Sequence, residues 1–376
     1  MDFALTEEQA DLRDLAARIL SEQLPAERVK EIEERHEAGY FAAETWQALA
    51  KADLIGLCLP EAHGGGGYGF VELALMLEQV GRHVAPLPLL PTLVLGALPI
   101  AEFGTPAQQR ALLPGVIAGD LILTAALSEG GDGLPPAVPA TTAVAEGEGW
   151  VLSGTKHLVP AGELASHALV PARTGGGGES TVFLVDLSLP GVLGEVSRSS
   201  NLEPLTTFTF DGVRLGADAV LGSVAEGAEV VAWTTDRGVA AYCAVQAGVC
   251  EAALRITATY VSERKQFDTP IATFQAVAQR AADAYIDTEA VRLTAYQAAW
   301  RLAEGHPAAE ELAIAKFWAA EGAHRVVHAA QHLHGGIGVD ADYPVHRMFR
   351  WAKHIELSLG GGTTHLRKLG ALLAAG

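Results

Sequence analysis

Residues 260–275 read YVSERKQFDTPIATFQ, and this stretch lies between two long segments of helical periodicity. These segments cover roughly residues 226–262 and 271–304, a third follows at about 308–334, and a last helix is expected after residue 363. Four long helices in succession predict a helical bundle for the C-terminal part of the chain.

The pattern changes upstream of the bundle. Short β-rich runs that begin at Trp150, Thr181 and Thr206 are separated by glycine clusters, one of which, at 175–178, is expected at a loop tip. Before about residue 120 the periodicity is helical again, with a capping-box spacing at the start and helices near 43–54, 70–82 and 106–118. The predicted fold class is α+β, with an all-helical domain at 1–119, a small β domain at 120–216 and a helical bundle domain at 217–376.

The composition is typical of a globular protein. Of 376 residues, 49% are apolar and 6% aromatic, and no apolar run reaches the roughly 18 residues that span a bilayer. We therefore expect a cytoplasmic protein without membrane contact. The net charge of −19 disfavours nucleic acid, so local basic groups or backbone N–H groups must bind any anionic ligand. Cys58, Cys243 and Cys250 are too scattered for a disulfide framework or a metal site.

Two motifs carry candidate binding chemistry. Arg264 can pair bidentately with a phosphate, and Gln266 and Phe267 beside it can supply a hydrogen bond and an apolar wall. The glycines at 335–338, in the run QHLHGGIG that starts at Gln331, allow a ligand to approach the backbone closely. Taken alone, each motif also has an ordinary structural explanation. Arg264 can be a surface arginine, and the glycines can form a helix C-cap.

Two other patterns predict no site. The run HGGGG at 63–67 is not followed by the Lys-Ser/Thr of a phosphate loop, which excludes a nucleoside triphosphate site of that kind. His324, His328 and His332 recur every four residues on one helix face, but no carboxylate accompanies them at ligand spacing. We therefore expect no metal.

Three segments resemble motifs of the acyl-CoA dehydrogenase family. They are RKQFDTPI with FQ at 264–275, QHLHGGIG with YPVHR at 331–347, and PEAHGG at 60–65. They occur in the family's order, and the layout of helices, strands and helices covers essentially the whole chain. The resemblance implies FAD as cofactor, α,β-dehydrogenation of a CoA thioester, and transfer of the electrons to an electron-transfer flavoprotein.

The resemblance also implies an oligomer. In this family the two bundle motifs, at 264–275 and 331–347, bind the FAD of a neighbouring protomer across a subunit interface. It thereby assigns FAD binding to Arg264, Gln266, Phe267, Gln331, Gly335 and Gly336.

The sequence departs from the family at the catalytic base. The usual Glu of an EGT motif is replaced by Gly361 in the run LGGGTT, whose backbone N–H can still donate to the thioester carbonyl. Thr363 matches the Thr of that motif and is counted among the cofactor contacts. Some members carry the base on the first bundle helix, before an arginine, where this chain has Asp236. Aspartate is one methylene shorter, and a misplacement of about 1 Å costs on the order of 10²-fold in rate, so an ion pair or surface carboxylate is the alternative explanation.

The β domain departs as well. The family's loop along the pyrimidine edge of the flavin corresponds to SEGGDG, in which Ser128 keeps a hydroxyl. The family's KxWIT segment corresponds to KHLVP from Lys156, so the Trp that packs against the flavin and the Thr near it are both lost.

The elements donated to a neighbour's FAD are thus intact, whereas those that hold the chain's own FAD and supply its base are altered. This asymmetry predicts a heteromer, an α2β2 tetramer whose paralogous subunit carries the catalytic Glu. A self-sufficient homotetramer with Asp236 as base is one alternative, and a non-catalytic acyl-CoA-binding or scaffold protein is another. The runs GGGTTHLRKLG and FQAVAQRAADAYID are most similar to actinobacterial heterotetrameric members that act on steroid side-chain CoA thioesters.

Small residues on the first bundle helix permit two explanations. They leave room for a bulky acyl group, or they serve close packing between helices, and packing is favoured of the two. The residues concerned are Ala240, Ala241, Ala244 and Gly248.

Overall fold

The chain divides into two compact units, and the longest helix, α7 (Gly227–Glu263), contributes residues to both. The computed structural model describes residues 3–35, 40–130 and 133–375. One unit, here the helical unit, comprises Met1–Glu34, Phe70–Ala85 and Val239–Gly376; the other, the sheet unit, comprises Arg35–Gly69 and Pro86–Gly238. The helices and the sheet confirm the α+β class, whereas the boundaries drawn between three domains stay a prediction.

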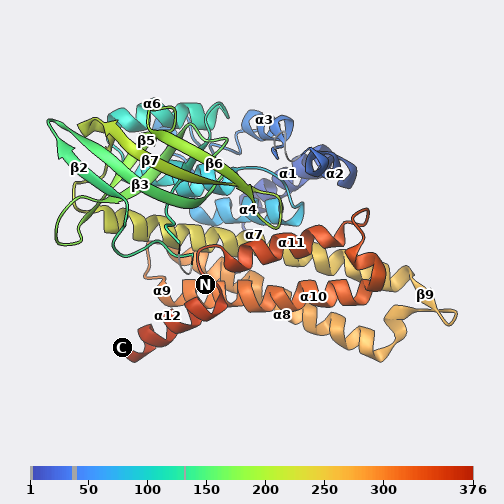
Figure 1. The fold of residues 1–376 in the computed structure, drawn as a ribbon. Helices are drawn as coiled ribbons and strands as arrows, with labels where there is room; N and C mark the ends of the chain where they lie inside the picture. Colours follow the sequence, from blue (N-terminus) through green and yellow to red (C-terminus); the bar gives the residue numbers. More distant parts are fainter. Residues whose placement is uncertain (1–2, 36–39, 131–132, 376) are drawn as a thin grey trace. The chain divides into compact units, whose positions relative to one another are not determined.

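The helical unit holds eight helices besides most of α7, together with a short hairpin and two π- or 3-10-helical segments near α10. Figure 1 shows α8, α10 and α11 as neighbouring helices, and α10 packs on both of the others. The helices are α1 (Glu7–Gln23), α2 (Ala26–Glu34), α4 (Phe70–Arg82), α8 (Gln275–Ala303), α9 (Ala309–Phe317), α10 (Ala323–His334), α11 (Val345–Leu357) and α12 (Gly362–Ala375).

Local sequence sets several of these bounds. The Thr6 hydroxyl accepts from the backbone N–H of Gln9, and the Gln9 side chain accepts from the backbone N–H of Thr6, so the predicted capping box starts α1. The observed α4, α7 and α8 agree with the predicted segments to within a few residues. The helix α11 was not predicted, although its buried residues follow a helical period: Val345, Met348, Trp351, Ala352 and Ile355.

Glycines allow α4 and α7 to pack closely. A Cβ on Gly81 would lie 1.9 Å from the carbonyl oxygen of Val245, and one on Gly248 would lie 1.9 Å from that of Glu78. Ala240, Ala241 and Ala244 are fully buried. The small residues of α7 therefore serve helix packing, the explanation that the sequence favoured.

The sheet unit is built on an eight-stranded sheet with the order β6-β7-β3-β2-β4-β5-β8, in which β1 pairs parallel to β4. Its strands are β1 (Leu123–Ala125), β2 (Thr142–Glu146), β3 (Gly149–Pro160), β4 (His167–Arg173), β5 (Ser180–Asp186), β6 (Val192–Arg198), β7 (Pro204–Leu215) and β8 (Val220–Leu221). The glycine tract 175–178 lies in the loop between β4 and β5, as predicted. Phe183 and Phe210 lie in the centre of the sheet's buried core.

Helices α3 (Ala43–Lys51), α5 (Leu98–Phe103) and α6 (Pro106–Ile117) complete this unit, with a π-helical segment, η3 (Leu90–Ala97), before α5. The glycine run at 63–67 folds back on its own loop. A Cβ on Gly65 would lie 2.2 Å from the carbonyl oxygen of Leu59, and one on Gly66 would lie 2.8 Å from that of Leu57. These glycines are therefore required by a tight turn rather than by a bound phosphate.

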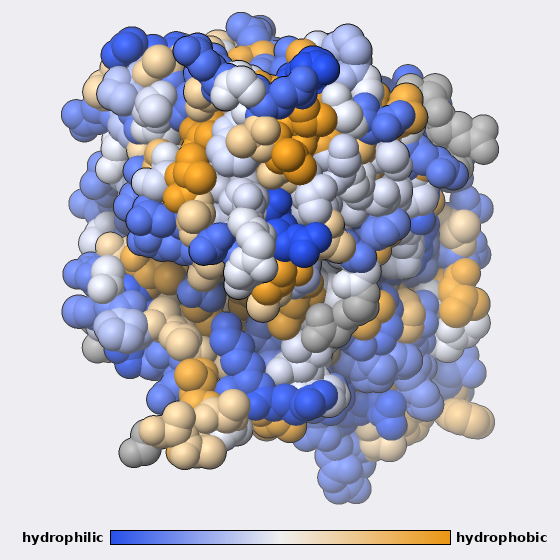
Figure 2. Space-filling model, turned by 60° about the vertical axis from the view of Figure 1, so that its left-hand side comes forward, coloured by the Kyte–Doolittle hydropathy of each residue, from blue (hydrophilic) through white to orange (hydrophobic). Residues whose placement is uncertain are grey.

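By length and apolar composition alone, α7 could cross a membrane. However, 78% of its most apolar window is buried inside the protein, as in a core helix. On the face drawn in Figure 2, hydrophobic side chains form small separate patches among hydrophilic ones. Among the described residues, this one helix is therefore only weak evidence for a membrane span.

Candidate active site

Arg264 follows α7 directly and begins an exposed hairpin. The strands β9 (Lys265–Gln266) and β10 (Thr269–Pro270) pair antiparallel, and the two turn residues, Phe267 and Asp268, have φ of 53° and 63°. Positive φ at both central positions defines a type I′ turn, which aspartate tolerates better than most residues. Because the turn is tight, the side chains of Arg264, Gln266 and Phe267 are presented together.

This hairpin is strongly exposed in the single chain. Phe267 is 88% exposed, and its ring meets that of Phe274 edge-on, with ring centroids 6.4 Å apart. Arg264 and Gln266 are also exposed, and the Arg264 guanidinium has no ion pair within the described residues. An apolar ring and an unpaired cation held out on a fixed turn are suited to a ligand or a partner chain.

The second predicted element lies at the end of α10. The Gln331 side chain donates to the carbonyl of Gly338 at 2.8 Å and fixes the 3-10 segment η7 (Gly335–Val339). Gly335, with φ of 63°, and Gly336 are exposed, and a Cβ on either would meet no atom within 4 Å. Their backbone is therefore open to a ligand, as the motif predicts.

The C-terminal loop leads from α11 to α12 through Leu359 and Gly360, which have φ of 50° and 88°. The carbonyl of Gly361 accepts from the backbone N–H of His365, whereas its own N–H has no acceptor within the described residues. A Cβ on Gly361 would come no closer than 3.8 Å to the carbonyl oxygen of Glu356. The loop therefore keeps a free backbone donor and has room for a side chain; Thr363 lies exposed in the first turn of α12.

Lys316, at the end of α9, supports this loop. The sequence alone did not predict this role. Its side chain is fully buried, and its ammonium donates to the carbonyls of Ile355 and Glu356, at 2.9 and 3.1 Å, at the end of α11. Burial lowers the pKa of Lys316 to about 8, against the opposing charges of Cys243 and Glu356. A cation at a helix C-terminus stabilises the unpaired carbonyls there.

In the sheet unit, Ser128 lies at the start of the loop that corresponds to the family's flavin loop. Its hydroxyl accepts from the N–H of Gly130 at 3.4 Å, and its carbonyl accepts from the N–H of His157 at 2.9 Å. Gly131 and Asp132, which continue the predicted motif, lie outside the described residues.

A buried ion pair anchors this loop, although no sequence pattern marks it. The Lys156 ammonium lies 2.7 Å from the Glu129 carboxylate, and the two side chains are 0% and 8% exposed. Burial raises the pKa of Glu129, but hydrogen bonds from Lys156 and Thr141 outweigh it, so the net shift is downward. The pKa of Lys156 is lowered by burial. Both changes are compatible with an ionised pair at neutral pH.

Two residues further along β3, Leu158 stands where the family has its flavin-packing Trp. It lies in the irregular register between Lys156 and Val159, with φ of 53° and 57% exposure. The irregular backbone presents the Leu158 side chain outward, and this side chain has no aromatic ring.

Asp236 lies in the first third of α7, half-buried and already engaged by a partner. Its neighbour Arg237 lies over the ring of Trp233, 3.4 Å from the centroid. Burial lowers the pKa of Arg237 to about 10, opposed by the charges of Glu102 and Asp236. Asp236 therefore lies in a partly desolvated, charged environment, which suits either an ion pair or a base.

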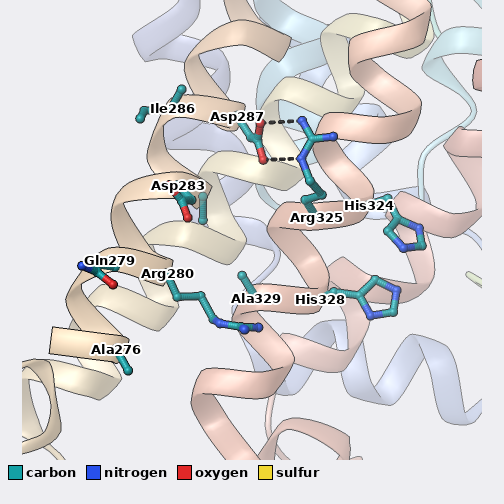
Figure 3. A pocket seen from close by; sticks show the side chains of 11 residues that line it. Ala276, Gln279, Arg280, Asp283, Ile286, Asp287, His324, Arg325, His328 and Ala329 are labelled. Atoms are coloured by element: carbon teal, nitrogen blue, oxygen red, sulfur yellow. Dashed lines mark hydrogen bonds and ion pairs between the residues drawn. The ribbon is translucent and has the colours of Figure 1, made fainter. Parts of the chain in front are cut away.

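A separate pocket of about 780 Å³ opens between α8 and α10 in the helical unit (Figure 3). Arg325 binds Asp287 bidentately across it, at 2.8 and 2.6 Å, and the rings of His324 and His328 lie 4.2 Å apart. Among the residues that the structure describes, no group of three or more His, Cys, Asp or Glu could hold a metal. None of the residues assigned to FAD lines this pocket.

Comparison with known families agrees with the fold and with these motifs. The N-terminal, middle and C-terminal domains of acyl-CoA dehydrogenase match residues 6–120, 124–213 and 225–371, respectively. The chain belongs to the acyl-CoA dehydrogenase family. It is an oxidoreductase whose cofactor is FAD.

Individual relatives match over nearly the full chain. Acyl-CoA dehydrogenase FadE27 of Mycobacterium tuberculosis is 39% identical over 382 residues, covering 100% of this chain and 99% of its own. The structure of the ChsE4-ChsE5 complex from the same organism superposes with a TM-score of 0.93 at 39% identity, covering 100% of both chains. A variant of the Tcur3481-Tcur3483 steroid ACAD matches with a TM-score of 0.90 at 44% identity, covering 98% of each chain.

The residues present fit FAD. An anionic cofactor needs exposed cations and open backbone donors, and the helical unit presents both, in Arg264 and in Gly335 and Gly336. Bound FAD supplies a hydride acceptor for the β-hydrogen of the thioester.

Proposed function

We propose that this chain is one subunit of a heteromeric acyl-CoA dehydrogenase and contributes the neighbour-facing half of an FAD site. The observation that carries the proposal is the contrast between the exposed hairpin and the C-terminal loop. Arg264, Gln266 and Phe267 project from the hairpin without a partner that accounts for them, while the loop has Gly361 in place of a carboxylate. A sister subunit that carries the Glu and the Trp-Ile-Thr segment would supply the missing half.

In this proposal the chain's own residues act by binding and orienting. Arg264 pairs with the FAD pyrophosphate, and the Gly335 and Gly336 backbone lies alongside it. Gln266 and Phe267 supply a hydrogen bond and an apolar wall, and Gln331 holds the glycine segment through Gly338. The partner's Glu removes the α-proton of the thioester, and an electron-transfer flavoprotein accepts the electrons.

The related structures support this assembly. The ChsE4-ChsE5 relative is a complex of two named components, and the Tcur3481-Tcur3483 relative is named a steroid ACAD. We therefore propose an α2β2 tetramer with a paralogous subunit and, as substrate class, CoA thioesters of steroid side chains.

One observation favours a second candidate, a self-sufficient homotetramer. Asp236 is half-buried on the first bundle helix next to Arg237, where some members carry their base. In that case Asp236 takes the α-proton, while the N–H of Gly361 donates to the thioester carbonyl and Ser128 and Thr363 contact the chain's own cofactor.

Expression of the chain alone and together with a Glu-bearing paralogous subunit distinguishes the two. We expect the chain alone to be colourless and inactive with ferrocenium and acyl-CoAs, and the co-expressed assembly to be yellow, tetrameric by mass and active. A yellow, active chain that loses turnover in Asp236→Ala but not in Asp218→Ala, an exposed aspartate, would establish the homotetramer instead. A colourless chain that binds acyl-CoA and gains no flavin with any partner would identify a non-catalytic acyl-CoA-binding protein.

A further inference from the structure

Three aromatic rings meet where the two FAD-facing segments begin. His334, the last residue of α10, stacks on Tyr260 of α7 with ring centroids 4.4 Å apart and a 25° interplanar angle. Tyr343 lies 5.1 Å from the His334 ring and 6.2 Å from the Tyr260 ring. The Tyr260 hydroxyl also donates to the carbonyl of His334 at 3.4 Å.

The His334 ring is buried and held in one tautomer. It is 3% exposed, and its Nδ1 lies 2.7 Å from the carbonyl oxygen of Ala330. A carbonyl can only accept, so Nδ1 carries the hydrogen and Nε2 is bare in the neutral ring. Nε2 has no hydrogen-bond partner within the described residues.

The ring stack connects the residues that directly precede the hairpin and the glycine segment. The N–H of Arg264 donates to the carbonyl of Tyr260 at 2.8 Å, one helical turn before the hairpin. Gly335 follows His334 directly and turns the chain into η7 with φ of 63°. A shift of the His334 ring would therefore move both segments relative to each other.

We propose that His334 is a positioning residue, whose neutral ring holds Arg264 and the glycine pair in the mutual geometry that binds the neighbour's FAD pyrophosphate. The inference rests on the proposed function, because it assumes that these groups bind FAD across a subunit interface. The stack itself lies within one chain, so its effect on the two segments can be measured apart from cofactor binding.

Protonation of the His334 ring should weaken its hold on the hairpin and the glycine segment. Burial lowers the pKa of His334 below its ordinary value of 6.5, although the Ala330 carbonyl opposes the shift. The titratable groups that face it are the phenols of Tyr260 and Tyr343, with Glu263 acting on Tyr343; burial raises the pKa of Tyr343. An added proton on Nε2 would then be a buried donor without an acceptor.

The sign of the pH dependence follows. The unfolded histidine takes up its proton near pH 6.5, and the folded one only at lower pH. The stability that this group contributes is therefore fully present above pH 6.5 and is lost as the pH falls from there toward the folded pKa. FAD retention should fall over the same window.

The test compares His334→Ala and His334→Phe with His332→Ala, an exposed histidine in the same last turn. In the chain alone, hydrogen exchange of residues 264–270 and 335–339 should speed up about tenfold in His334→Ala and hardly at all in His334→Phe, which keeps the stack. In the co-expressed assembly, FAD should bind about tenfold more weakly in His334→Ala, the loss of roughly one stabilising contact. His334→Phe should restore binding and abolish the loss of FAD between pH 7 and 5.5, and His332→Ala should match wild type.

Unchanged hydrogen exchange in His334→Ala, or a loss of FAD at low pH that persists in His334→Phe, would overturn the proposal that His334 positions the two segments. A wild-type assembly that binds no FAD would refute the proposed function instead. Should His334→Ala fail to fold, the comparison of wild type with His334→Phe across pH decides the inference by itself.

Discussion

The hairpin at 264–270 and the loop at 359–361 belong to the same helical unit, and both hold their backbone in left-handed conformations. The hairpin presents Arg264, Gln266 and Phe267 to solvent, whereas the loop presents a glycine with a free N–H. Both places have a defined backbone geometry, but only the hairpin carries side chains suited to binding a cofactor. The difference teaches that the backbone of such a loop does not depend on the side chain at position 361, because buried residues such as Lys316 hold the helix end beside it.

The largest expected effect concerns Lys316, the buried lysine that binds the carbonyls at the end of α11. The buried Lys316 has its pKa lowered to about 8 from 10.5, so the folded chain releases this proton before the unfolded chain does. Between pH 8 and 10.5 the unfolded chain binds more protons, and the free energy of unfolding should rise by up to about 3 kcal/mol relative to Lys316→Met. Denaturant unfolding at several pH values checks this, with Lys353→Met, a half-buried lysine on α11, as the control. Parallel curves for wild type and Lys316→Met would show that folding does not lower the pKa of Lys316.

The next effect concerns the hairpin. Removing the guanidinium in Arg264→Ala should weaken FAD binding by the co-expressed assembly by about 1.5–3 kcal/mol, roughly 10- to 100-fold, since a charge-assisted hydrogen-bond pair is lost. Arg255→Ala removes an exposed arginine within α7, paired with Glu251, and should leave binding unchanged. Flavin titration by fluorescence measures both, and equal affinities for the two variants would place the phosphate contact elsewhere.

A smaller effect is expected where the base is missing. Gly361 has no positive φ and open space around its Cβ, so Gly361→Glu should change the free energy of unfolding by about 1 kcal/mol or less. The restored carboxylate should still give no turnover in the chain alone, because Leu158 and Pro160 replace the flavin-contacting Trp and Thr. Ferrocenium reduction by Gly361→Glu without a partner would mean that the chain's own flavin site is complete.

The smallest effect on the isolated chain is expected at the tip of the hairpin. Phe267→Ala removes a ring that is 88% exposed and should alter the free energy of unfolding by no more than about 0.5 kcal/mol. In the assembly the same change should reduce the tetramer fraction or the flavin content, seen by light scattering and absorbance. A large loss of stability in the chain alone would contradict the view that this ring is kept for a partner.

Much of the helical architecture could be predicted because it depends on local periodicity. The capping box of α1 and the bounds of α4 follow from residues close in sequence. The helix α11 was missed although its apolar residues repeat every three to four positions, because its first residues were interpreted only as a binding motif. Its pattern was a sufficient signal.

The supports of the candidate site could not be predicted in the same way. Glu129 and Lys156 are 27 residues apart, and Lys316 meets carbonyls about 40 residues away. Such contacts depend on which strands pair and which helices pack, and neither residue type nor spacing marks them in advance. The roles assigned to Asp236, Ser128 and Thr363 stay predictions.

The exposed ring of Phe267 has a consequence for the life of the chain in a cell. Until a partner covers it, each newly made copy carries an apolar tip of the kind that chaperones and proteases recognise and that promotes aggregation. In the heteromer that we propose, cells should therefore match the synthesis of this chain to that of its partner, and an excess of either chain should be short-lived.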